Sequence, residues 1–327
     1  MASICIIERA DCLLILGRLE EAAATYEEGI RHCEQLGAER DVAVGKSQIG
    51  TVRLHQLRYK EALAAYEEAR ERFTRLDEPH SIAKIWHQIG RVYQEAKQPE
   101  AAEDAYRKSL AFKVQIGDLG GQANTLVQLG NLYDFVLNRP EEAVTFYRQA
   151  ADKYVENHDR AKEGTVRTNL AGTLIKLHRF NEARQEIHQA IECKAPFGHA
   201  SEPWTSWAIL SDLETNARNP DAAEQAKQRA IECYFAYRRD GGENHTLTGR
   251  FVYDMTKTLR ASGPTATASF LQDLAAEPNL AQVRPFVQAL QAIIAGSRDR
   301  SLADNPDFDY SMAAEILFLI ETLEKPQ

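Results

Sequence analysis

The chain has 327 residues, of which 44% are apolar and 27% are charged, and its formal net charge is −9. This composition excludes a disordered chain, and the excess of acidic residues disfavours nucleic acid or an anionic membrane as a general partner. Charged residues interrupt the apolar start of the chain, so we expect neither a signal peptide nor a membrane helix and predict a cytoplasmic protein.

The first predicted helix is unusually apolar, with runs at Ile4–Ile7 and Cys12–Leu16. One stripe of this helix is needed to pack against the helix that follows, and the side chains left over would form an exposed apolar patch. Three arrangements account for such a patch. The chain continues a longer array, two copies form a homodimer through the N-terminal helix, or the helix tilts and buries these side chains within its own repeat.

A repeat of forty residues organises the first 241 residues. Small residues and tyrosines recur at this spacing, at Gly50, Gly90 and Gly130 and at Tyr26, Tyr66 and Tyr106. One extra residue before Glu141 moves the series to Ala143 and Tyr147. We assign six repeats, of which the first and sixth are degenerate, over residues 1–39, 40–79, 80–119, 120–160, 161–201 and 202–241.

Each repeat is predicted to form two helices joined by a short turn. Pro-Glu or Pro-Asp steps in the turns at 97–100, 138–141 and 219–221 suit the start of a second helix, because proline loses no hydrogen bond there and an acidic side chain meets the positive end of the helix dipole. The second helix carries Ala-x-x-x-Tyr. Glycine or alanine lets the paired helices approach closely, so we predict that Tyr66, Tyr106 and Tyr147 are buried.

The period fails after Gly241-Gly242. Residues 243–260, 265–275, 280–296 and 308–324 still have the apolar spacing of helices, and we assign residues 242–327 to a helical region that caps the last repeat, as repeat arrays require. The whole chain is therefore expected to contain about sixteen helices and essentially no strand.

The motif of the third repeat resembles the tetratricopeptide repeat. It contains Trp86, Ile89-Gly90, Tyr93, Ala102 and Tyr106 in the family's order. The forty-residue period is similar to that of kinesin light chains and the Leu-Gly-Asn repeat adaptors, and the chain as a whole resembles bacterial proteins of this family. The resemblance implies an all-α fold, a right-handed α-solenoid of helix-turn-helix repeats over residues 1–240.

Patterns typical of catalysis or metal binding are weak in this chain. The glycine-rich turn Gly117–Gly121 lacks the Lys-Ser or Lys-Thr that follows a phosphate-binding loop. The five cysteines form no CxxC pair, and Cys193 and Cys233 lie forty residues apart in matching Ile-Glu-Cys triplets, which predicts buried core positions. We therefore expect no enzyme, no cofactor and no metal site.

The resemblance implies a concave groove lined by the first helices, and residues that flank the Leu-Gly position would point into it. This set is rich in amides, which offer both a donor and an acceptor to a peptide backbone. It comprises Gln48, Thr51, His55, Lys84, His87, Gln88, Arg91, Asn124, Gln128, Asn131, Thr168 and Asn169.

Within this set, Lys84, His87 and Arg91 share one helix face and form a neutral-to-basic patch, which suits an acidic peptide or one with a free terminal carboxylate. The alternative is that the residues are ordinary surface groups, or point into a neighbouring helix and satisfy one another. The predicted function is a scaffold that binds a peptide or partner protein. The alternative function is a ligand- or peptide-sensing subunit of a bacterial signalling or defence system whose output domain lies on another chain.

Overall fold

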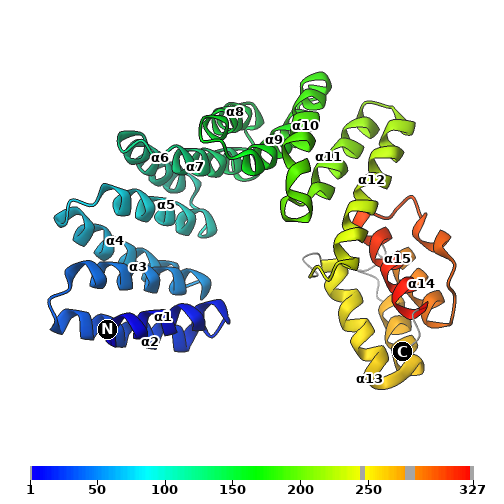
Figure 1. Ribbon diagram of the computed structural model, residues 1–327, viewed down its shortest axis with the longest axis horizontal. Coiled ribbons are helices and arrows are strands. Elements are labelled where there is room, and N and C mark those ends of the chain that lie inside the picture. Colours follow the sequence, from blue (N-terminus) through cyan, green and yellow to red (C-terminus); the bar gives the residue numbers. More distant parts are fainter. Residues whose placement is uncertain (1, 244–246, 277–283, 325–327) are drawn as a thin grey trace. The chain divides into compact units, whose positions relative to one another are not determined.

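The computed structural model describes residues 2–243, 247–276 and 284–324, and these residues form helices and turns with no strand among them (Figure 1). They divide into two compact units, Met1–Leu177 (unit 1) and His178–Gln327 (unit 2). The expectation of an all-α fold is confirmed. In the described ranges no helix combines the length and the apolar character that crossing a membrane requires.

Unit 1 is a series of helices in which each helix packs against its neighbours along the chain. Its helices are α1 (Ala2–Ile15), α2 (Leu19–Gln35), α3 (Glu39–His55), α4 (Tyr59–Arg75), α5 (Pro79–Glu95), α6 (Pro99–Gln115), α7 (Leu119–Asn131), the π-helix η1 (Leu132–Val136), α8 (Pro140–Glu156) and α9 (Arg160–Lys176).

Most helices of unit 1 end through the same backbone turn. A residue with positive φ follows the helix about every twenty positions, as at Gly17, Gly37, Leu57, Asp77 and Lys97. The next amide then donates back over the helix end, for example Arg58 N to Arg53 O at 2.8 Å and Gln98 N to Tyr93 O at 2.9 Å. This bond satisfies a carbonyl that the helix leaves free. The predicted turns before the second helices are confirmed.

The contact between the two helices of a repeat is made by a glycine and a tyrosine. A Cβ atom added to Gly90 would lie 2.6 Å from the ring of Tyr106, and one added to Gly130 would lie 2.5 Å from the ring of Tyr147. Tyr66, Tyr106 and Tyr147 are fully buried, which confirms the prediction. In the first repeat Ala10 takes the place of the glycine and is also buried.

The N-terminal helix α1 is partly buried in unit 1. Ile7 and Leu14 are half-buried against the core formed with α2 and α3, whereas Ile15 and Leu16 are 84% and 69% exposed. The side chains of Ile4 and Cys5 lie outside the described residues. The structure thus leaves apolar surface at the end of α1.

Unit 2 begins with the second helix of the predicted fifth repeat. Its helices are α10 (Phe180–Lys194), the 3-10 helix η2 (Ala195–Ser201), α11 (Pro203–Asn216), α12 (Pro220–Arg239), α13 (Leu247–Ala276), α14 (Arg284–Ile294), the 3-10 helix η4 (Arg300–Ala303) and α15 (Tyr310–Glu324). Within unit 2, α12, the last helix of the predicted repeats, packs against α15 of the predicted capping region.

The C-terminal helices agree with the sequence pattern where they are described. The predicted helices 243–260 and 265–275 correspond to α13, which is broken at Gly263, a residue with φ of 79°; residues 244–246 of the first prediction lie outside the described ranges. The predicted helices 280–296 and 308–324 correspond to α14 and α15, and residues 280–283 lie outside the described ranges. Cys193 is buried as predicted, whereas Cys233 is half-buried.

Candidate functional site

The predicted site residues lie on α3, α5, α7 and α9, the first helices of successive repeats in unit 1. Helix α5 shows how the sequence positions them. Its residues Ile82, Ile85, Ile89 and Val92 are buried, so they form the stripe that packs into the unit. The polar residues between them face outward or toward the adjoining helices.

An amide recurs at one position of four consecutive repeats. Gln48, Gln88 and Gln128 are forty residues apart, and Asn169 follows forty-one residues later because of the extra residue before Glu141. All four side chains are half-buried. We call these four residues the amide row.

The amide row is largely free of internal hydrogen bonds. Arg91 Nη1 donates to Gln88 Oε1 at 3.0 Å. The side-chain amides of Gln48, Gln128 and Asn169 have no hydrogen-bond partner within the part of the chain that the structure describes. Each repeat therefore presents a donor and an acceptor at the same place.

Three of the predicted residues instead hold tyrosine hydroxyls of the second helices. Tyr147 donates to Asn131 Oδ1 at 2.7 Å and Tyr154 donates to Asn124 Oδ1 at 2.8 Å. The hydroxyls of Thr51 and Tyr66 lie 2.9 Å apart. These residues help to fix the helix pairs, as the alternative from the sequence supposed, although each asparagine keeps an amide NH₂ group for another acceptor.

The third repeat breaks this pattern because its residue in that position is Arg91. A guanidinium has no acceptor, so the Tyr106 hydroxyl donates instead to Gln94 Oε1 at 3.0 Å. The charge of Arg91 acts to lower the pKa of both Tyr66 and Tyr106, against the larger effect of burial. Arg91 forms no ion pair with a carboxylate in the described ranges, and Lys84 on the same helix is exposed.

His87 differs from the sequence-based expectation. Its Nδ1 lies 3.2 Å from Thr125 Oγ1. Burial, helped by the charges of Lys113 and Arg91, lowers its pKa to about 3. The ring is therefore neutral at physiological pH and adds no charge to a basic surface, because it points between helices toward α7.

Thr168 and His55 differ in exposure from the other predicted groove residues. Thr168 is 7% exposed, and its hydroxyl donates to Gly164 O at 2.8 Å within its own helix. It belongs to the packing of α9 and not to an open face. His55 is exposed at the C-terminal end of α3.

Lys113 is a buried cation that the sequence analysis did not single out. It is 5% exposed, and its Nζ donates to Thr125 Oγ1 at 2.7 Å. Burial lowers its pKa to about 8. The forty-residue period could have identified this residue. Position 113 is equivalent to positions 33 and 73 of the preceding repeats, where Cys33 and Phe73 are buried, so a lysine at 113 occupies a core position.

The extra residue of the fourth repeat is absorbed by the π-helix η1. This insertion buries Asp134, whose Oδ2 accepts from Lys176 Nζ at 2.9 Å and from Thr173 Oγ1 at 3.1 Å. Phe135 is left 68% exposed, with Lys176 Nζ 4.3 Å from its ring centroid. Such single π-turns are frequent at functional sites, and the sequence showed only the added residue.

Two family models match the chain, and both are described as tetratricopeptide repeat. The first covers residues 41–113 and the second covers residues 125–161. These segments cover most of α3 and α6, all of α4, α5 and α8 and the second half of α7. They contain Gln48, Gln88 and Gln128 of the amide row, whereas Asn169 of α9 lies outside them. No curated protein matches the chain in sequence.

Several solved structures have a similar fold at low sequence identity. BtubC (BKLC) from P. vanneervenii is 16% identical, with a TM-score of 0.61 over 70% of this chain and 94% of that one. The apo form of RapI is 12% identical, with a TM-score of 0.60 over 98% and 100%. The apo quorum sensor NprR from B. thuringiensis is 10% identical, with a TM-score of 0.53 over 99% and 87%. These likenesses concern the fold alone.

Proposed function

Because the chain belongs to the tetratricopeptide-repeat family, we propose that it binds an extended segment of a partner protein along α3, α5, α7 and α9. The amide row is the observation that carries this proposal. Its members recur once per repeat, so they can contact successive residues of an extended peptide. Three of the four side chains have no hydrogen-bond partner within the described ranges. Main-chain groups of a bound segment supply the missing donors and acceptors.

The role is binding and not catalysis. The side chains of the amide row neither take up nor release a proton near neutral pH. His87 is neutral and directed into the helix packing, so it is not placed to act as a base on this face.

The bound segment carries a carboxylate, either an acidic side chain or a chain terminus. Arg91 and Lys84 lie on α5 without a carboxylate partner in the described part of the protein, although the chain as a whole is acidic. A charge-assisted bond from either cation would place the segment along the amide row. Replacing both with glutamine is expected to weaken binding and to reduce its dependence on salt.

A photocrosslinking residue tests the location of the binding face. Placed at Gln128 it should capture a partner from cell extract, whereas the same residue at Gln149, an exposed glutamine on α8, should not. Capture that is equal at both positions, or present only at Gln149, contradicts the proposal.

A sensor is the second candidate, since the solved quorum sensor NprR has a similar fold. A sensor changes its dimensions when its ligand binds, because the ligand favours one of two conformations. A scaffold keeps its dimensions. Small-angle X-ray scattering of the chain with and without the captured segment distinguishes the two, and an unchanged radius of gyration favours the scaffold.

A further inference from the structure

Two equivalent junctions between repeats of unit 1 are built from different kinds of side chain. Where α4 meets α5, Phe73, Ile82 and Ile85 are buried and belong to one apolar core. The same three positions recur forty residues later, where α6 meets α7, and their side chains are again buried but polar. They are Lys113, Gln122 and Thr125. Burial of polar groups where the neighbouring junction buries apolar ones weakens the contact between the helices.

Hydrogen bonds replace the apolar contact at the junction of α6 with α7. Lys113 Nζ donates to Thr125 Oγ1 at 2.7 Å, and Gln122 Nε2 donates to the carbonyl oxygen of Lys113 at 3.2 Å. His87 Nδ1 of α5 lies 3.2 Å from the same threonine hydroxyl, so Thr125 links three helices. Each such bond contributes less to stability than the burial of an isoleucine side chain.

Lys113 also brings a charge into this junction without a counter-ion. It forms no ion pair with a carboxylate in the described ranges. Burial is the main cause of its low pKa of about 8, while nearby Asp118 acts to raise this pKa and Lys84 of α5 acts to lower it. Helix α7 contributes no ionisable side chain to the junction, and His87 is already neutral at pH 7 because its pKa is about 3.

The start of α7 is also less stable than the start of α5. Asp118 caps α7 by accepting from Gly121 N at 2.8 Å, but Gly120 and Gly121 lie in its first turns, and glycine disfavours a helix. Helix α5 begins instead with Pro79 and has no glycine in its first turn. A segment with few apolar contacts and a weak helix start opens more readily than its neighbours.

We propose that the junction of α6 with α7 is a proton-sensitive joint. It opens more readily when Lys113 is charged, because the charge then regains water, and it stays closed when the side chain is neutral. Gln88 lies on one side of the joint and Gln128 on the other, so opening changes the spacing within the amide row. That consequence for binding rests on the proposed function, whereas the joint itself does not.

Hydrogen exchange of the chain without any ligand measures the opening. Between pH 7 and pH 9, residues 113–125 should become about tenfold better protected relative to the equivalent residues 73–85. The factor follows because Lys113 has a pKa of about 8 in the closed joint and about 10.4 when it is exposed to water. The comparison of equivalent segments removes the effect of pH on the chemical exchange rate.

Two variants separate the charge from the packing. Lys113→Met has no charge to bury, so opening should be rare and its frequency should not depend on pH. Lys113→Arg stays charged at both pH values, so residues 113–125 should be no better protected at pH 9 than at pH 7, relative to residues 73–85. Lys60→Met, at an exposed position of α4, is the matched control and should show the same change with pH as the wild type.

Equal changes of protection in residues 73–85 and 113–125 of the wild type would overturn the proposal. So would a pH dependence that persists in Lys113→Met, because another group would then control the joint. Neither result bears on the amide row, because no partner is present in this experiment. A failure of the joint is therefore distinguishable from a failure of the proposed binding face, which the crosslinking residue at Gln128 tests.

Discussion

Unit 1 and unit 2 are both helical, but they are held together in different ways. Unit 1 uses one contact repeatedly, a glycine against a buried tyrosine, as at Gly90 and Tyr106. Unit 2 relies on contacts that occur once. In it Trp204 packs against Tyr237 with ring centroids 4.9 Å apart, and Arg238 of α12 pairs with the fully buried Glu315 of α15.

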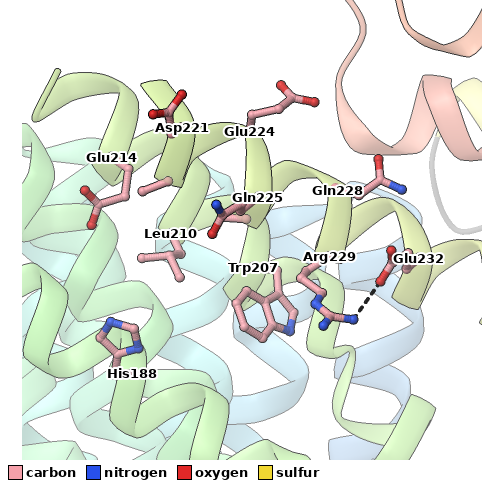
Figure 2. A pocket seen from close by; sticks show the side chains of 12 residues that line it. His188, Trp207, Leu210, Glu214, Asp221, Glu224, Gln225, Gln228, Arg229 and Glu232 are labelled. Atoms are coloured by element: carbon pink, nitrogen blue, oxygen red, sulfur yellow. Dashed lines mark hydrogen bonds and ion pairs between the residues drawn. The ribbon is translucent and has the colours of Figure 1, made fainter. Parts of the chain in front are cut away.

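This difference determines what surface each unit presents. Repetition in unit 1 places an amide side chain at the same point of the first helix of four successive repeats, which yields the amide row. The single contacts of unit 2 bring unlike groups from α10, α11 and α12 to one cavity of about 1010 Å³, which is lined by aromatic, aliphatic, amide and charged side chains (Figure 2). A repeated surface suits an extended ligand and a cavity suits a compact group.

The largest effect is expected when the repeated contact of unit 1 is broken. Tyr106→Ala removes a fully buried ring and should destabilise the protein by about 3–5 kcal/mol. Hydrogen exchange should accelerate in α5 to α8, whereas the amides of α12, α14 and α15 should keep their protection. Tyr253→Ala, at a position 59% exposed on α13, is the control. If it costs as much as Tyr106→Ala, the assigned role of the tyrosines is wrong.

The corresponding contact of unit 2 is the buried ion pair. Arg238 Nε donates to Glu315 Oε1 at 2.8 Å, and burial raises the pKa of Glu315. Arg238→Met leaves this buried carboxylate without a cation, although the Tyr234 hydroxyl still donates to it, and should cost about 3 kcal/mol at pH 7. The double variant Arg238→Met with Glu315→Gln should recover more than half of the loss, measured by urea unfolding.

The sign of the pH effect provides an independent check on this pair. A carboxyl whose pKa is raised in the folded state takes up its proton there before it does so in the unfolded chain, so the loss caused by Arg238→Met should shrink as pH falls from neutral toward the ordinary pKa of glutamic acid. A loss that is independent of pH would show that Arg238 acts through packing alone.

A smaller effect of opposite sign is expected at Lys113. Its pKa is about 8 in the folded protein and about 10.4 in an unfolded chain. Below pH 8 both states carry the charge and folding has to bury it. As pH rises from 8 toward 10.4 the folded state loses the proton first, and this cost disappears.

Lys113→Met should therefore stabilise the protein by about 2 kcal/mol at pH 7, and the gain should decrease toward pH 10. Thr125 keeps a partner in the variant, because its hydroxyl also donates to Gly121 O at 3.1 Å. Thermal unfolding of Lys113→Met and of Lys60→Met, an exposed control, measures the difference. A destabilised Lys113→Met would contradict the role assigned to burial of the charge.

The forty-residue period of the sequence predicted most of the fold because the same glycine–tyrosine contact recurs at that spacing. Where Gly50, Gly90 and Gly130 share a spacing with tyrosines, the helix pair and its buried side chain follow from packing. The π-helix η1 could not be predicted in this way, because one extra residue in the sequence can be placed in a loop as easily as in a helix. Neither did the contacts of Glu315, which join residues far apart in the sequence.

The site was harder to predict because one residue along a helix changes the direction of a side chain by about 100°. His87 and Gln88 are neighbours in the sequence, yet His87 contacts Thr125 while Gln88 joins the amide row. The apolar stripe of a helix therefore predicts which side chains face outward only to within about one residue, or about 100°. The cavity of unit 2 draws on three helices in a region where the repeat is degenerate, so the sequence offered no pattern for it.

The most direct test of the account is the affinity of the partner captured at position 128 for the variant Gln88→Ala with Gln128→Ala. Surface substitutions of this kind should change stability by no more than about 0.5 kcal/mol. Gln35→Ala with Gln149→Ala removes two exposed glutamines from α2 and α8 and is the control. We predict that calorimetry finds the first variant at least about tenfold weaker and the control equal to wild type. Equal affinity for both variants would show that the amide row does not bind the partner.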